Sequence, residues 1–434
     1  MPSPDARFHP PVETELIEAG RRTPGQRDAD RILYSYGFQR LAGITQVTGT
    51  EAGAILHSRL THSLKVAQVA RRITERLLAQ MPDRAARHEL DPDVAEAAAL
   101  AHDLGHPPFG HVAEHKLDEL AAGWGGFNGN AQSFRIVTQL EHKRIEYSGL
   151  NLTRRTLRGI LKYPWMRGPD GKRHTSWGAY DTESDIFEWA TQGVSDGVLH
   201  PLAAIMDWAD DVTYAVHDVE DFFRAGLVPL ERLGSRIHSD RHQVVEHAAA
   251  KLDVATADLA ELAEQLFEFD FSWDRGWVGS KDDRQHLHSD TSGLLERLIF
   301  AVHLGEDGSI TIGETERQIV AILKALTWRY VIDRSALTAT QQGQQDVIEG
   351  LHEYFLRELR SHRDTPEGRR YRAFPRVYRD LLHELGGDPD DPATLRLITD
   401  VIAGMTEETA YQLFGRIRGH AVGSILDATA RSIR

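Results

Sequence analysis

The stretch ALAHDLGHPPFGHVAE, residues 99–114, brings histidine and carboxylate side chains together at the junction of two predicted helices. Imidazole nitrogen and carboxylate oxygen together suit a divalent ion such as Mn²⁺, Fe²⁺, Co²⁺ or Ni²⁺. An ion held in this way can turn water into a nucleophile near neutral pH. An isolated His-Asp pair is weak evidence, and a second one stands at His217-Asp218. Only the neighbouring sequence can therefore indicate which of the two His-Asp pairs belongs to a metal site.

The helices on either side of this stretch can be predicted from their end signals. Asp91-Pro92 is a typical helix start, and the helix is expected to run from Val94 to Leu104 and to stop at Gly105, before two prolines. A short helix is expected over about residues 111–120, and a long one over 199–224. Strand signals are few and helical periodicity is common, so the sequence predicts an all-α protein.

Composition narrows the choice of function. The chain has 434 residues, a net charge of −15, no cysteine and no apolar run long enough to span a membrane. Metal ligands must then be histidine and carboxylate, and an anionic substrate would need a local cationic pocket. The acidity makes a nucleic-acid partner unexpected without excluding it. Because the N-terminus lacks the apolar stretch of a signal peptide, we expect a cytoplasmic protein with no membrane partner.

Several short sequence motifs along the chain resemble those of a known family. They are RTP and QRD (22–28), QRLAGITQV (39–47), SRLTHS (58–63), FNGNAQS (127–133), GLNLT (149–153), KYPW (162–165) and IAGMT (402–406). With the order His62, His102-Asp103, Asp210, they resemble the deoxynucleoside triphosphate (dNTP) triphosphohydrolases of the HD superfamily. The resemblance extends from about Arg22 to Tyr411.

The resemblance implies a metal site with one divalent ion per chain, for which Mn, Mg, Fe, Co and Ni are all candidates. Its ligands would be His62, His102, Asp103 and Asp210. Asp210 is chosen over its neighbour Asp211 because the family pattern is Asp-x-x-x-Tyr. The alternative is that these are buried, hydrogen-bonded polar residues without an ion.

The resemblance also implies a catalytic pair. His111 and Glu114, three residues apart on one helix, would act as proton donor and orienting carboxylate, and His106 would face the phosphates. The alternative is a histidine at a helix start followed by an ordinary first-turn acid.

Further substrate contacts are implied for several residues. Arg59 would bind the triphosphate, with Lys162 as a weaker candidate. Tyr214 would form a wall against the sugar, Asp218 would bind the 3′ hydroxyl, and Gln46 would be another sugar contact. Without the resemblance, the two cations would be ordinary solvated side chains and Tyr214 a core aromatic residue.

The implied function is hydrolysis of a dNTP, with dGTP as one option, to a deoxynucleoside and inorganic triphosphate. A metal-activated hydroxide would attack the α-phosphorus. The alternatives are another HD phosphohydrolase, acting on nucleoside monophosphates, cyclic nucleotides or guanosine polyphosphates, and a non-catalytic nucleotide sensor. The resemblance also implies a homo-oligomer, with a hexamer favoured, and leaves a dNTP effector open.

We expect three segments in the chain. Residues 1–24 form a flexible arm, residues 25–228 an HD phosphohydrolase core, and residues 229–434 a C-terminal helical region that completes the pocket and the oligomer contacts. One departure from the family pattern lies at Asn128-Gly129, where relatives carry an acidic residue or, in some cases, a histidine.

Overall fold

The computed structural model describes residues 3–10, 21–46, 58–169, 171–233, 240–333, 335–361 and 371–420. Within these ranges the chain is mainly helical, which confirms the predicted all-α class. Two three-residue strands, β1 (Val302–Leu304) and β2 (Ile310–Ile312), form an antiparallel hairpin. Sequence periodicity did not indicate this hairpin, because three residues are too few to establish an alternating pattern.

The helices that position the site are α4 (Arg59–Gln80), α6 (Pro92–Ala101), α7 (His111–Leu120), α8 (Gly129–Arg135), α9 (Arg154–Ile160) and α12 (Pro201–Arg224). The other helices before β1 are α2 (Pro24–Leu33), α3 (Tyr36–Arg40), α5 (Pro82–Arg87), α10 (Gly171–Thr175), α11 (Ser184–Thr191), α13 (Leu230–Leu233), α14 (Asp240–Leu252), α15 (Thr256–Gln265) and α16 (Lys281–Phe300). Those after β2 are α17 (Glu314–Thr327), α18 (Ser335–Ser361), α19 (Arg376–Glu384), α20 (Pro392–Ala403) and α21 (Glu407–Ile417).

Helix α6 begins where the sequence predicted and ends slightly earlier. The Asp91 carboxylate accepts a hydrogen bond from the backbone N–H of Asp93 at 2.9 Å and so caps the helix. The helix ends at Ala101, and the next hydrogen bonds are those of tight turns, from Leu104 N to Ala101 O and from His106 N to Asp103 O. His102 and Asp103 therefore lie just beyond the helix, where their side chains can leave its axis.

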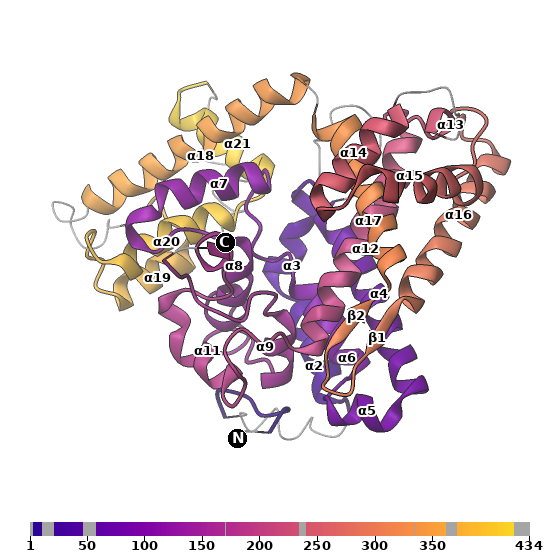
Figure 1. Cartoon of the computed structure of the whole chain (residues 1–434). Coiled ribbons are helices and arrows are strands. Elements are labelled where there is room, and N and C mark those ends of the chain that lie inside the picture. Colours follow the sequence, from indigo (N-terminus) through magenta and orange to yellow (C-terminus); the bar gives the residue numbers. More distant parts are fainter. Residues whose placement is uncertain are drawn as a thin grey trace.

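The apolar core consists of two main clusters. The larger is built around α2, α4, α6, α9, α12 and α14–α17. The second joins α7 to α18, α19, α20 and α21, so that Ala113 and Leu117 of α7 pack with Ile348 and Leu351 of α18. Figure 1 shows α7 beside α18 and α20, on the opposite side of the molecule from α12 and α17. The loop after α6 thus connects the larger cluster, which contains α6, to the second cluster, which contains α7.

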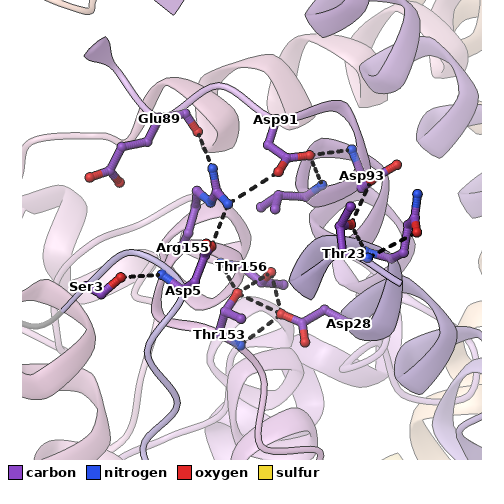
Figure 2. Close-up of polar contacts among 12 residues, drawn as sticks. Ser3, Asp5, Thr23, Asp28, Glu89, Asp91, Asp93, Thr153, Arg155 and Thr156 are labelled. Atoms are coloured by element: carbon purple, nitrogen blue, oxygen red, sulfur yellow. Dashed lines mark hydrogen bonds and ion pairs between the residues drawn. The ribbon is translucent and has the colours of Figure 1, made fainter. Parts of the chain in front are cut away.

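A buried carboxylate ties α2 to the start of α9. The Oδ2 atom of Asp28 accepts hydrogen bonds from Thr153 N at 2.8 Å and from the hydroxyls of Thr153 and Thr156, each at 2.7 Å (Figure 2). Its Oδ1 atom accepts from Arg7 at 2.7 Å. Residues 3–10, which the sequence placed in a flexible arm, are therefore held against the helical body by side-chain and backbone hydrogen bonds, including Arg154 N to Ala6 O.

Candidate active site

The first turn of α4 carries two of the predicted site residues. Ser58 caps this helix by accepting a hydrogen bond from Thr61 N, so the turn that holds Arg59 and His62 is well defined. Both side chains are buried. Because α4 packs against α6 and α12, this turn faces the end of α6 and the middle of α12.

Three of the four predicted metal ligands meet at this point. The Nε2 atom of His62 lies 2.9 Å from Oδ1 of Asp210, and Nε2 of His102 lies 3.6 Å from the same oxygen. One donor atom from each of these residues lies within 4.8 Å of the other two. Two imidazoles and one carboxylate at these separations are a donor set that a divalent transition metal can occupy.

The backbone and the orphaned nitrogen of His102 both support this assignment. Its Nδ1 atom lies 2.6 Å from the carbonyl oxygen of Ala99, which can only accept, so Nδ1 carries the proton. The Nε2 atom is buried and has no hydrogen-bond partner among the described residues. A buried ring nitrogen that faces a carboxylate without a hydrogen bond fits a metal ligand better than a packed core histidine.

Asp103, the fourth predicted ligand, lies beside this trio and contacts two other predicted site residues. Its Oδ2 atom accepts a hydrogen bond from Arg59 at 2.7 Å. Its Oδ1 atom lies 3.4 Å from Nε2 of His102 and 3.0 Å from Nδ1 of His106. The Asp103 carboxylate therefore lies between His102 and His106.

The charges of this cluster favour the binding of a cation. Burial on its own opposes ionisation of the two carboxyls. Arg59 and His102 nevertheless hold the pKa of Asp103 well below its usual range, and the approach of His102 and His62 does the same for Asp210. Burial also opposes protonation of His102, but the carboxylates of Asp103 and Asp210 outweigh it and raise the pKa of this imidazole to about 9. A divalent ion would take the place of that proton.

The predicted catalytic pair is formed in the structure. The Nδ1 atom of His111 lies 2.9 Å from Oε2 of Glu114, while Oε1 of Glu114 accepts a hydrogen bond from Gly129 N at 2.7 Å. Burial by itself raises the pKa of Glu114, but its contacts with His111 and His106 lower it to about 2. An ionised carboxylate at this position orients the exposed His111 ring.

A cavity of about 450 Å³ extends from His102 and Asp210 to His111 and Glu114. Its walls include the predicted residues Gln46, Arg59, His106, Lys162 and Tyr214. The volume is within the usual range for a small-molecule site. Two predicted site residues do not line the cavity: His62, which contacts Asp210, and Asp218.

Two lysines beside α12 are paired with carboxylates of this helix. Lys162 lies 2.5 Å from Asp207, one turn before Asp210 on α12. Asp211 contacts Lys324 of α17 at 2.5 Å, so it is directed toward another helix and away from the His62–His102 cluster. The structure is thus consistent with the choice of Asp210 over Asp211.

Asp218 lies on the predicted face of α12 but is buried and does not line the cavity. Burial, followed by the charges of Asp221 and Asp210, raises its pKa well above the ordinary value. Its Oδ2 atom has no hydrogen-bond partner among the described residues, and neither does Oε1 of Gln46, which does line the cavity.

Sequence reasoning missed the part of the cavity wall that comes from distant segments. Thr340, Gln341 and Gln344 of α18 line the cavity, as do Asn130 and Glu407. Glu407 accepts hydrogen bonds from the N–H and the hydroxyl of Thr45, at 2.9 and 2.8 Å, and so fixes the residue before Gln46. Glutamines on an amphipathic helix carry no pattern that separates a cavity position from a solvent position.

Comparisons with known proteins identify two domains in the chain. Residues 59–215 match the model of the HD domain, and residues 310–416 match the model of the phosphohydrolase-associated domain. The fold and the His/Asp cluster thus define an HD-domain hydrolase.

The relatives identify the family more closely. A deoxyguanosinetriphosphate triphosphohydrolase-like protein of Streptomyces coelicolor is 36% identical, with 96% of this chain and 97% of the relative aligned. Similar proteins from Corynebacterium glutamicum and Shewanella oneidensis are 35% and 30% identical, over 90% and 91% of this chain and 90% and 93% of the relatives. The chain belongs to the family of deoxyguanosinetriphosphate triphosphohydrolase-like proteins. None of the helices in the described ranges is both long enough and apolar enough to span a membrane.

Proposed function

We propose that this protein hydrolyses dNTPs to a deoxynucleoside and inorganic triphosphate. The observation that carries the proposal is that Asp210 and Tyr214 lie one turn apart on α12 and line the same cavity as Arg59 and His111. A metal ligand, a wall for a sugar, a phosphate-binding cation and a proton donor thus share one space. The names of the relatives support the same substrate class.

The metal would be held by His62, His102 and Asp210, with Asp103 as the fourth proposed ligand. When bound, a divalent ion would supply Lewis acidity at the α-phosphate and lower the pKa of a water molecule. The pairing of Nδ1 of His102 with the Ala99 carbonyl keeps its other nitrogen directed at this position.

The proposed phosphate contacts are Arg59, Lys162 and His106. Arg59 is fixed by Asp103 and Lys162 by Asp207, so both cations are held in place before a substrate arrives. This preorganisation lowers the entropic cost of binding a triphosphate. Carboxylates of Asp103, Glu114, Asp210 and Glu407 line the same cavity, so a bound divalent ion would supply further positive charge for a triphosphate.

We assign the leaving-group proton to His111. Because Nδ1 of His111 faces the Glu114 carboxylate, its Nε2 atom is left to deliver a proton to the 5′ oxygen as the bond from that oxygen to the α-phosphorus breaks. Water supplies the new oxygen on the α-phosphorus, and the nucleoside leaves with a 5′ hydroxyl. Glu114 stabilises the protonated ring.

The proposed sugar contacts are Tyr214, Asp218 and Gln46. The Tyr214 ring lines the cavity next to Asp210 and can pack against the face of a deoxyribose. Gln46 lines the cavity and has one buried oxygen without a partner, which a hydroxyl of the substrate would satisfy. Asp218 does not line the cavity, and its assignment rests on the family resemblance alone. The predicted homo-oligomer, dNTP effector and cytoplasmic location remain predictions.

Product analysis tests the proposal. Metal-loaded protein is incubated with each dNTP alone and with mixtures, and the products are separated by anion-exchange chromatography. We expect a deoxynucleoside and inorganic triphosphate. Release of a deoxynucleoside monophosphate and pyrophosphate would contradict the assigned bond. Turnover of monophosphates, cyclic nucleotides or guanosine polyphosphates, without turnover of any dNTP, would favour another HD phosphohydrolase.

A further inference from the structure

A second group of potential metal ligands lies beside the first. His106, His111 and Glu114 each offer one ligand atom, and these three atoms lie within 4.8 Å of one another. The rings of His106 and His111 stand edge to face with centroids 5.3 Å apart. None of these three residues belongs to the His62–His102–Asp210 cluster.

The first supporting observation is an unpartnered nitrogen. Nδ1 of His106 is buried and has no hydrogen bond among the described residues, because its 3.0 Å approach to Asp103 lacks hydrogen-bond geometry. A buried ring nitrogen without a hydrogen bond costs free energy that an ion would recover.

The second observation is that the Glu114 carboxylate is held in a fixed orientation and can be reached from solvent. Its Oε1 atom is held by Gly129 N, which leaves Oε2 directed at His111. A Cβ atom at position 129 would lie 3.2 Å from Oε1 of Glu114 and 3.7 Å from Nδ1 of His106. Gly129 therefore leaves the side of the trio clear, and the His111 side chain, 73% exposed, gives an ion access from solvent.

We propose that His106, His111 and Glu114 form a second divalent-cation site, of the two-histidine, one-carboxylate type. Such a donor set suits Zn²⁺, Co²⁺, Ni²⁺ or Fe²⁺ and leaves coordination positions for water or phosphate oxygen. The chain would then bind two ions, the tighter one at His62, His102 and Asp210.

One carboxylate connects the two sites. The Oδ1 atom of Asp103 lies 3.4 Å from Nε2 of His102 and 3.0 Å from Nδ1 of His106, so the same oxygen faces both clusters. A carboxylate oxygen that faces two donor sets can contact an ion in either one. Occupation of the two sites is therefore coupled through Asp103.

An ion at the second site has a consequence that rests on the proposed function. With an ion on one ring nitrogen, His111 can no longer become an imidazolium, the N–H that remains is a much weaker acid, and Glu114 can no longer orient the ring. Excess Zn²⁺ therefore inhibits an enzyme whose first site is already filled. His115, exposed on the same helix, provides a matched control because it lies outside the trio.

The test counts ions and does not require turnover. Metal-free full-length protein is dialysed against excess Zn²⁺ and the bound metal is measured by elemental analysis, and Co²⁺ titrations are followed by visible absorption. We expect two ions per chain for the parent protein and for H115Q, and one for H111Q and for E114Q. A single ion on the parent protein, or two on H111Q, would overturn the proposal.

A second readout separates this inference from the proposed function. If two ions bind and H111Q loses one, the second site stands even when no dNTP is hydrolysed. If dNTPs are hydrolysed but excess Zn²⁺ leaves the rate unchanged while the second ion binds, the inhibitory consequence is wrong. Circular dichroism of H111Q, compared with H115Q, shows whether a missing ion reflects a lost ligand or a lost fold.

Discussion

The Nδ1 atom of His102 lies 2.6 Å from the carbonyl oxygen of Ala99, one turn earlier in the chain. The backbone of α6 therefore fixes the tautomer and direction of a proposed metal ligand, a task that often falls to a second carboxylate. Since α6 is buried along most of its length and begins at a capped Asp91, the orientation of His102 depends on the whole helix.

Metal content should distinguish Asp210 from its neighbour. We expect D210N to lose metal affinity by more than about 100-fold, beyond the usual effect of an outer-shell change, because a ligand oxygen becomes an amide. D211N should retain its metal and lose less than about 1 kcal/mol of stability, since its half-exposed pair with Lys324 is weak. Elemental analysis after dialysis checks both. Equal losses in the two variants would contradict the assignment of Asp210.

The loop that carries Asp103 and His106 requires a glycine at position 105. A Cβ atom there would lie 2.1 Å from the carbonyl oxygen of Gly129, so G105A must push α8 away from the loop. We expect a loss of about 1–3 kcal/mol in the free energy of unfolding, with weaker metal binding. G123A is the control, because a Cβ at that position meets nothing within 4 Å. Urea denaturation measures both, and equal stability of the two variants would refute the explanation.

The buried carboxylate of Asp28 should be essential for stability. In D28N an amide replaces one of two oxygens that together accept four hydrogen bonds, and Arg7 loses its ionic partner. We expect a loss of about 3 kcal/mol. D30N on the same helix removes only a half-exposed pair with Arg22 and should cost less than about 1 kcal/mol. Thermal denaturation of the two variants tests the difference.

His200 should make stability depend on pH. It caps α12 by accepting a hydrogen bond from Leu202 N, and burial lowers its pKa to about 4. The unfolded chain binds a proton near pH 6.5 and the folded chain does not. The contribution of His200 is therefore complete above pH 6.5 and declines as the pH falls toward 4, by up to roughly 3 kcal/mol.

The variant H200N isolates this contribution. Asparagine is a good N-cap and does not titrate, so H200N should lose less stability than the parent protein between pH 6.5 and 4. Chemical denaturation at a series of pH values gives the difference between the two curves. Parallel curves would show that the protonation of His200 does not contribute.

Features that depend on a local sequence pattern could be predicted from the sequence. The cap at Asp91 and the stop before Pro107 place α6 within a few residues, and the spacing of Asp210 and Tyr214 places both on one face of α12. The resemblance supplied the convergence of His62, His102 and Asp210, which no local rule provides.

Contacts between segments that are far apart in the chain could not be predicted from the sequence. Nothing at Gln341 or Gln344 indicates a cavity wall, because that role arises only when α18 packs on α7. The ion pair of Lys162 with Asp207 and the occupation of both Glu407 oxygens by Thr45 likewise depend on how helices are placed in space. Side-chain partners of this kind are set by tertiary packing, which intrinsic propensities do not encode.

The chain passes from the larger apolar cluster into the second one between α6 and α7. The proposed site residues are therefore supported by two different parts of the core. The proposed metal ligands are anchored in the first, while His111 and Glu114 belong to a helix whose apolar face is packed in the second. We therefore expect substitutions among the buried residues of α18 or α20 to alter the proposed proton delivery by His111 without altering metal binding at the proposed ligands. Natural variation in the C-terminal half of such enzymes has a route to adjust catalytic rate while the ligand set is left intact.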